Sequence, residues 1–547
     1  MGKKEKAGDA ARTAGRGFLV ITGAKAWFFL SASILNFGLP LLFKSPADYG
    51  TYGLVINAVS VLNMVVITGT LQAVSKLVSE DPSAVRAVLR RATLLQAAIG
   101  LSLAAGYALL AGPIASWLKD DSYVSLLRLS ALVVVAYSFY AIYIGALNGL
   151  KEFTRQATLD IIFATFRTGF ILAAVAVGLG VMGAIIGFVV AAIVILALAM
   201  YWVYKYLRQQ GIGPSVAVID SKRLAFFLLS TMFYTFLLNM VIRIDLFLVK
   251  RFAAQAIESD TQAAFVSNSM AGAYNLMLNI ARVPYQAVIA IAFVIFPMLS
   301  QSTFESDLEK TRGYVRDTMR YTLLIVGLFA SVLAGAGADV VRPMYPDYAY
   351  ASDSLLVLCV AYALFALLYV GTTMLIAAGR PWVASLLTIG SALILIAACL
   401  VLVDGAELGV PMLNQAALAV LIAMAAGLAG TGIFFKKSYG GFIATKSALR
   451  LTALIAIVTA IGHFTRFDHF VNFGDLSPFN STEGVGQVAR SMLGSRMKWL
   501  TLAGGKAVGL GVAYLALLFV SGELGPDDKA RVKRVFSRKK KAATTAH

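Results

Sequence analysis

Long apolar runs recur along almost the whole chain and are separated by short polar segments. Most are 20 residues or longer, the length an α-helix needs to cross about 30 Å of hydrocarbon. The apolar residues are continuous rather than alternating, which favours helices over the strands of a membrane barrel. We therefore predict an all-α integral membrane protein with about fourteen transmembrane helices. The predicted spans are 17–43, 49–75, 92–118, 125–149, 157–179, 181–204, 224–249, 266–300, 321–343, 354–379, 382–403, 412–435, 448–465 and 499–521.

One of these runs, 266–300, is longer than a straight crossing requires. Pro284 lies inside it, and a proline within a helix removes one backbone hydrogen bond and clashes with the preceding turn. We expect this helix to be tilted, kinked near Pro284, or extended beyond the membrane.

Composition supports the membrane assignment. Hydrophobic residues make up 59% of the 547 residues and charged residues only 14%, whereas soluble domains carry about 25% charged residues. With the N-terminus placed in the cytoplasm, roughly two-thirds of the 47 Lys and Arg residues fall in loops and tails on that side. Both tails are therefore predicted to be cytoplasmic. The net charge of +19 reflects this bias and does not indicate nucleic-acid binding, because it is scattered over many loops.

A weak internal repeat relates the second and eighth predicted spans. Four residue types recur at one offset of 222 residues, the separation of Gly50 and Gly272. Transporters are often built from such repeats, with the substrate between the two halves. We predict two pseudo-symmetric six-helix bundles followed by two further helices. The segments are a basic tail 1–16, bundles 17–204 and 224–435 joined by a linker 205–223, a C-terminal pair 436–521, and a basic tail 522–547.

Short motifs in both halves resemble those of polysaccharide flippases. The second-span region of those flippases is similar to Tyr52-Gly-Leu and to the segment Thr70-Leu-Gln-Ala-Val-Ser-Lys76-Leu-Val-Ser-Glu80. Its counterpart in the second half is similar to Pro284 followed by Phe296-Pro-Met-Leu-Ser300. The turn after the tenth span is similar to Gly379-Arg-Pro381. In this order they resemble the multidrug/oligosaccharidyl-lipid/polysaccharide exporter superfamily, in its polysaccharide and lipid-linked oligosaccharide flippase branch. The resemblance covers residues 17–435.

Ionisable residues inside the membrane are costly and mark candidate sites. Four cations and two acids fall within the first twelve spans, a balance that suits an anionic ligand such as a pyrophosphate. Several polar residues lie on shared helical faces, and Asp245 either pairs with a neighbouring helix or couples transport to an ion. The predicted substrate-binding residues are Arg282, Arg243, Lys25, Arg167, Asn279, Asn275 and Asn57, and the candidates for ion coupling are Asp245 and Asp160.

The resemblance implies a flippase, not an enzyme. It would move an isoprenoid-pyrophosphate-linked oligosaccharide across the bacterial inner membrane by alternating access, for cell-surface polysaccharide biosynthesis. Membrane lipids and a polysaccharide polymerase or export machinery are the expected partners. No metal or cofactor is expected beyond a coupling Na⁺ or H⁺.

Three alternative functions stay open at this stage. A peptidoglycan-precursor flippase and a multidrug exporter would share the fold. A membrane glycosyltransferase or polymerase would need catalytic groups in a large external loop, and only the segment from His463 to Asp475 offers any. Its spacing matches no metal-ligand pattern.

Overall fold

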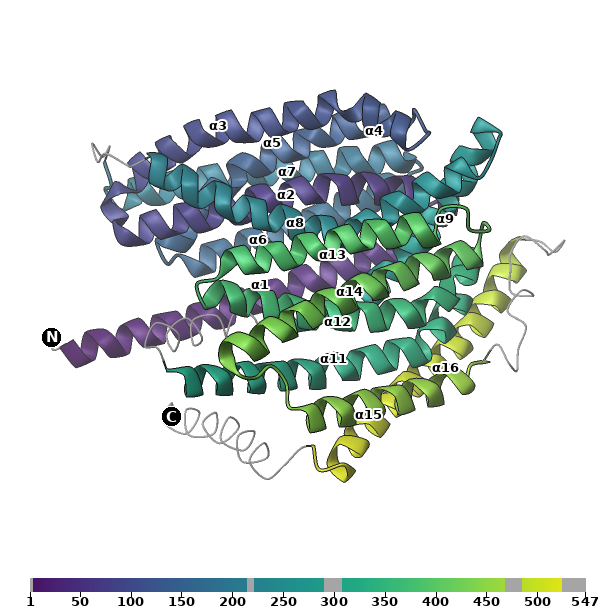
Figure 1. Ribbon diagram of the computed structural model, residues 1–547. Helices are drawn as coiled ribbons and strands as arrows, with labels where there is room; N and C mark the ends of the chain where they lie inside the picture. Colours follow the sequence, from purple (N-terminus) through teal and green to yellow (C-terminus); the bar gives the residue numbers. More distant parts are fainter. Residues whose placement is uncertain (1–2, 214–220, 290–306, 468–484, 524–547) are drawn as a thin grey trace. The chain divides into compact units, whose positions relative to one another are not determined.

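The computed structural model describes residues 3–213, 221–289, 307–467 and 485–523 (Figure 1). Within these ranges every regular element is a helix, and 13 helices are long and apolar enough to cross a membrane. They correspond to the predicted spans with one exception, 266–300. The predicted all-α membrane fold is confirmed.

The exception is a broken helix. Helix α9 (Asp260–Ala281) ends in a turn at Arg282, and residues 283–289 are helical again. The break falls two residues before Pro284, where the missing N–H and the ring interrupt the helix. The helix is interrupted near Pro284, as the proline leads one to expect, while residues 290–300 of this predicted span lie outside the described residues.

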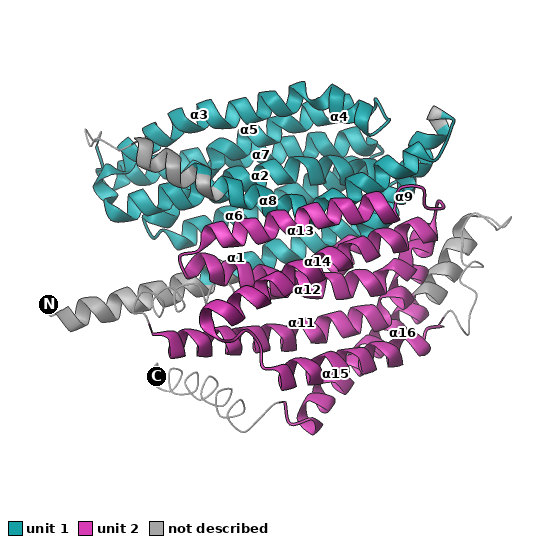
Figure 2. Ribbon diagram, viewed as in Figure 1, with its two compact units in different colours: residues 1–276 teal, residues 277–547 magenta. Residues whose placement is uncertain are grey.

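The chain forms two compact units, Met1–Leu276 and Met277–His547 (Figure 2). In the first unit α2 packs against α5 and α8, α1 lies along α6, and α7 packs on α5 and α6. Its helices are α1 (Lys3–Leu42), α2 (Pro46–Glu80), α3 (Val85–Leu109), α4 (Ala111–Trp117), α5 (Tyr123–Gly149), α6 (Phe153–Ala176), α7 (Gly180–Gln209), α8 (Ser221–Gln255) and most of α9.

The boundary between the two compact units differs from the boundary between the two sequence repeats. The repeat puts the boundary in segment 205–223, so that α8 and α9 open the second half. The compact units instead divide within α9, after Leu276, because α8 packs against α2 and the first part of α9 crosses α2. Helix α1 begins at Lys3, so it includes most of the segment predicted as a basic tail.

The second unit is built around α11 and α12. Helix α12 packs against α11, α13 and α14, and the C-terminal pair α15 and α16 packs on α11. Helix α16 starts before the predicted span 499–521, so part of the predicted loop is helical. The elements are α11 (Leu308–Met344), the 3₁₀ helix η2 (Pro346–Asp353), α12 (Ser354–Ala377), α13 (Pro381–Leu402), α14 (Val410–Tyr439), α15 (Thr445–Phe464) and α16 (Val485–Val520).

Candidate functional site

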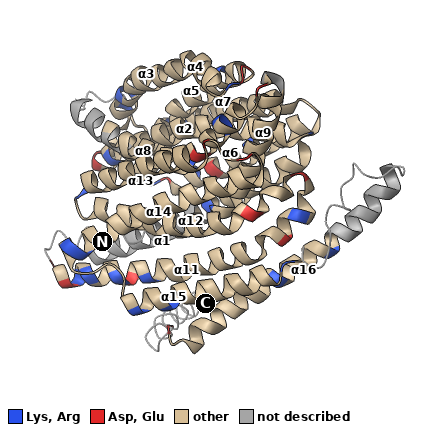
Figure 3. Cartoon of the chain, turned by 45° about the vertical axis from the view of Figure 1, so that its right-hand side comes forward, with Lys and Arg blue, Asp and Glu red and all other residues tan. Residues whose placement is uncertain are grey.

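Charged residues are sparse along the helices and gather near their ends (Figure 3). The few that lie within the spans are therefore informative, because each needs a partner in a low-dielectric medium.

Lys25 and Asp160 form an ion pair between α1 and α6. The Lys25 Nζ lies 2.8 Å from the Asp160 Oδ2, and the lysine side chain is 60% exposed while the aspartate side chain is 12% exposed. The pairing follows from the packing of α1 along α6. Because each charge neutralises the other, this pair contributes little net positive charge to the unit.

Arg167 lies on α6, seven residues beyond Asp160, and has no carboxylate in ion-pair range among the described residues. Its guanidinium carbon is 5.0 Å from the centre of the Phe28 ring and 5.8 Å from that of Phe163, and the hydroxyl of Tyr137 lies beside it. Its Nε is buried without a hydrogen-bond partner in the described part of the chain. Aromatic faces attract a guanidinium but accept few of its five N–H donors. Arg167 is therefore well suited to receive an anion.

Three predicted site residues meet where α2, α8 and α9 come together. The Asn57 Nδ2 donates to the Asn275 Oδ1 at 3.1 Å and to the Gly53 carbonyl at 2.7 Å. The Arg243 Nη1 donates to the Asn57 Oδ1. These side chains bond to one another across the three helices, which gives them a role in helix packing, although the Arg243 Nε is buried without a hydrogen-bond partner in the described part of the chain. Their predicted role in substrate binding stays a prediction.

The same helices cross at a pair of glycines. A Cβ on Gly50 would overlap the backbone carbonyl of Asn268, and a Cβ on Gly272 would overlap that of Pro46. Asn268 and Gly272 lie one repeat offset after Pro46 and Gly50. Each contact therefore joins the residues equivalent to those of the other contact, with the two halves interchanged. Reciprocal contacts of this kind are characteristic of a two-fold axis. The repeat seen in the sequence therefore has a structural counterpart at this crossing.

Asp245, on α8, is 1% exposed. The Tyr274 hydroxyl of α9 donates to its Oδ2 at 3.2 Å. Asp245 thus contacts a neighbouring helix, one of the two roles expected for it, and its role in ion coupling stays a prediction.

In the second unit, Arg282 lies at the break after α9. It is 8% exposed, its Nε donates to the Tyr362 hydroxyl at 3.0 Å, and its guanidinium is 5.3 Å from the centre of that ring. Tyr285 packs edge-on against Phe365 and Tyr369 of α12, which fixes the chain after the break. Asn279 is half-buried in the last turn of α9.

The sequence analysis missed two lysines that are paired inside the protein, Lys250, which is buried, and Lys506, which is nearly so. Lys250 falls one residue beyond a predicted span, and its partner Asp120 lies in a predicted loop. Lys506 lies inside a predicted span, and it pairs with the buried Asp339. Only the position of Lys506 within an apolar run could have signalled its importance. Of the alternative catalytic segment, His463 is described, but Asp468, His469 and Asp475 lie outside the described residues.

Comparisons with known proteins agree with this fold. A family model described as polysaccharide biosynthesis protein matches residues 31–303, while a comparison with curated proteins finds no match. The solved structure titled lipid II flippase MurJ, inward closed conformation, is 14% identical with a TM-score of 0.65, covering 92% of this chain and 99% of that one.

Two further solved structures are transporters. An inward-facing multidrug resistance MATE family transporter is 15% identical with a TM-score of 0.58, covering 75% of this chain and 94% of that one. A transporter of the MOP (multidrug/oligosaccharidyl-lipid/polysaccharide) superfamily from Pyrococcus furiosus is 16% identical with a TM-score of 0.52, covering 80% and 94%. At these identities the structures show the fold alone.

The fold is that of multi-pass membrane transporters. The family model over residues 31–303 and this shared fold both support the resemblance seen in the sequence, to the MOP exporter superfamily in its flippase branch.

Proposed function

We propose that the chain is a flippase for an isoprenoid-pyrophosphate-linked oligosaccharide, which it moves to the outer leaflet of the bacterial inner membrane for cell-surface polysaccharide biosynthesis. The observation that carries this proposal is Arg167, a half-buried cation held among aromatic rings with no acidic partner in the described residues. The family model supports the polysaccharide pathway, and a lipid II flippase shares the fold.

The charge balance after pairing supports an anionic substrate. Lys25 pairs with Asp160, and the intramembrane residues of the predicted site are four cations, Lys25, Arg167, Arg243 and Arg282, against two acids, Asp160 and Asp245. Cations thus exceed acids. A pyrophosphate would compensate this excess through bidentate hydrogen bonds, which guanidinium groups make well. A cationic drug would add to the excess, which disfavours the multidrug alternative.

The peptidoglycan-precursor alternative shares the pyrophosphate, so charge does not separate it from the polysaccharide substrate. We favour the oligosaccharide because the family model is described by polysaccharide biosynthesis. In this proposal both termini are cytoplasmic, the substrate is exposed alternately to either side, and Asp245 or Asp160 binds a coupling Na⁺ or H⁺. A polymerase or export machinery would take up the flipped product.

Arg167→Ala tests the proposal in liposomes that contain a fluorescent isoprenoid-pyrophosphate oligosaccharide. We expect a loss in flipping rate of roughly 30- to 5000-fold, because removing the charge that pairs with a desolvated anion costs about 2–5 kcal/mol. Arg167→Lys should recover only part of the rate, since lysine lacks the planar fork. Arg155→Ala is the matched control: it lies on the same helix, and its partner is Glu152.

Unchanged flipping in both Arg167→Ala and Arg282→Ala, at equal amounts of folded protein, would refute pyrophosphate binding by these cations. Competition with a peptidoglycan precursor and with a cationic dye then ranks the three substrates. Stronger competition by the dye would favour the multidrug function.

A further inference from the structure

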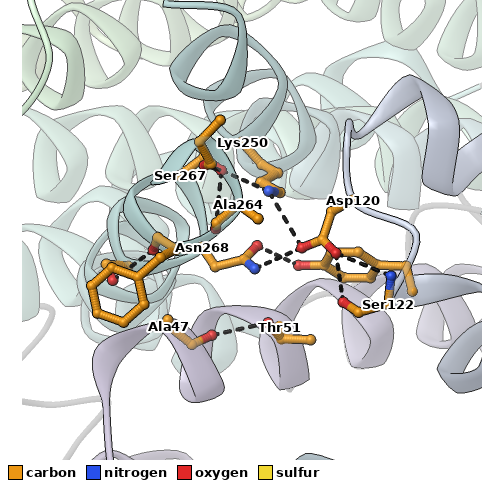
Figure 4. Close-up of polar contacts among 12 residues, drawn as sticks. Ala47, Thr51, Asp120, Ser122, Lys250, Ala264, Ser267 and Asn268 are labelled. Carbon is orange, nitrogen blue, oxygen red and sulfur yellow. Dashed lines mark hydrogen bonds and ion pairs between the residues drawn. The ribbon is translucent and has the colours of Figure 1, made fainter. Parts of the chain in front are cut away.

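The end of unit 1 that holds the α4–α5 and α8–α9 turns contains a buried charge cluster (Figure 4). The Lys250 side chain, near the end of α8, is 0% exposed, and Asp120, in the α4–α5 turn, is 7% exposed. Neither has a part in the proposed substrate site. A fully buried lysine is rare unless it is paired, so this cluster calls for an explanation.

The contacts join two groups of helices. The Lys250 Nζ donates to the Ser267 Oγ at 2.6 Å and lies 3.7 Å from the Asp120 Oδ2. The Asn268 Nδ2 of α9 donates to the same Asp120 oxygen at 2.8 Å, and the Tyr123 hydroxyl of α5 donates to the Asn268 Oδ1 at 2.8 Å. Hydrogen bonds thus tie the hairpin α8–α9 to the α4–α5 turn and to α5.

The glycine crossing strengthens the same connection. Asn268, which bonds Asp120, is also the residue whose carbonyl contacts Gly50 of α2. The sequence repeat assigns α8 and α9 to the second half, yet they pack within unit 1. The cluster therefore lies where α2 and α5 of the first repeat contact the hairpin α8–α9, which opens the second repeat.

The chemistry of the cluster favours a contact that opens. The Lys250 ammonium has three donors, but among the described residues it makes one hydrogen bond and one long ion pair, and its Nζ lies 5.9 Å from the centre of the Tyr123 ring. Asp120 is better satisfied, because it also accepts from the Ser122 backbone N–H and hydroxyl. If this end opens, water rehydrates both charges, which recovers the hydration free energy that burial costs them. An apolar contact would gain nothing from water.

We propose that Lys250, Asp120, Ser267 and Asn268 form a latch that holds the α8–α9 hairpin against α2 and α5 and that breaks when this end of the transporter opens to water. In the proposed orientation this is the external end. The latch depends on the transporter fold and not on which substrate is carried, so it can fail while the proposed function stands.

Cysteine labelling tests the latch without any substrate. The two native cysteines, Cys359 and Cys399, are first replaced by alanine. Thr51→Cys then reports opening, because Thr51 is 9% exposed on α2 beside Asn268 (Figure 4). Ser125→Cys, at an exposed position on α5, is the matched control for access of a membrane-impermeant maleimide from outside the cell.

With Lys250→Met we expect Thr51→Cys to react roughly ten- to a hundredfold faster, because the remaining buried Asp120 charge disfavours the closed state. Ser125→Cys should react at an unchanged rate. Asp120→Asn, which keeps the size of the side chain, should also accelerate the reaction. The double variant should react no faster than the faster single variant, since one interaction is lost in all three.

Three results would overturn the latch. One is an unchanged rate at Thr51→Cys in both single variants. Another is a double variant whose acceleration is the product of the two single effects, which would mean independent roles. The third is an equal acceleration at Ser125→Cys, which would indicate general loosening of the protein.

Discussion

The two units each contain a glycine crossing beside a buried lysine–aspartate pair. In unit 1, Gly50 of α2 meets Gly272 of α9 at the end that carries Lys250 and Asp120. In unit 2, a Cβ on Gly462 of α15 would overlap the backbone of Gly335 on α11, four residues before Asp339, and Lys506 of α16 pairs with Asp339. In both cases glycine lets two helix backbones come into contact, which brings neighbouring charges within reach.

The two lysines differ in how completely they are satisfied. Lys506 donates to the Asp339 Oδ2 and to the carbonyls of Gly462 at 2.7 Å and Thr465 at 3.0 Å. These carbonyls belong to the end of α15, where a cation also interacts favourably with the helix dipole. Lys250 makes one hydrogen bond in the described part of unit 1. A saturated ammonium gains nothing from water, whereas an undersaturated one does.

Unit 2 has a second fixed contact in the first half of α11. The Arg320 Nε lies 2.9 Å from the Glu523 Oε1, and the Ser447 hydroxyl donates to the same carboxylate oxygen. The C-terminal pair α15 and α16 is thus held on α11 at two points. We infer that the C-terminal pair moves with α11, while the hairpin α8–α9 is held at one end by a contact that can break.

The largest expected effect comes from Lys506→Met. Removing one partner of a buried pair costs about 3–5 kcal/mol, so the variant should unfold at a clearly lower temperature in detergent. The matched variant Lys250→Met should lower the unfolding temperature less, because opening rehydrates Asp120. Faster labelling at Thr51→Cys in Lys506→Met as well would contradict the proposed difference between the fixed Lys506–Asp339 pair and the Lys250–Asp120 pair that opens.

A smaller effect is expected from Gly272→Ala. Its Cβ would overlap the Pro46 carbonyl, and overpacking of this kind costs about 1–3 kcal/mol. We expect the closed α2–α9 contact to be lost, with faster labelling at Thr51→Cys and slower flipping. Gly169→Ala is the control, because no atom lies within 4 Å of its Cβ position, and there alanine should be neutral or slightly stabilising. Normal flipping by Gly272→Ala would show that the crossing is not tight in the working protein.

Hydropathy predicted the spans well because hydrocarbon thickness sets the length of each helix. It could not predict partners. Nothing in the sequence joins Lys25 to Asp160, since that pair depends on α1 packing along α6. Lys250 was assigned to a loop because a positive charge at the end of an apolar run is typical of a helix boundary. Its burial follows from its contacts with Ser267 of α9 and with Asp120 in the α4–α5 turn, which the sequence does not show.

The sequence predicted Asn57 and Asn275 as polar residues facing a lumen, whereas the structure shows them bonded to each other. Asn57→Ala therefore separates two roles. Hydrogen bonds between membrane helices contribute about 0.6 kcal/mol on average and at most about 1.7 kcal/mol, so a packing role predicts a small loss of thermal stability and nearly normal flipping per folded molecule. A role in substrate binding predicts normal stability with a flipping rate that recovers only at high substrate concentration.

The control for Asn57→Ala is Asn414→Ala on α14, where the side-chain oxygen has no hydrogen-bond partner among the described residues. Asn57→Ala/Asn275→Ala completes the double-mutant cycle. If the two asparagines act through their mutual hydrogen bond, the double variant loses less stability than the sum of the single losses, because either substitution already removes the bond. Additive losses would show that each asparagine acts on its own, and the glycines and the latch alone would then hold α9 on α2.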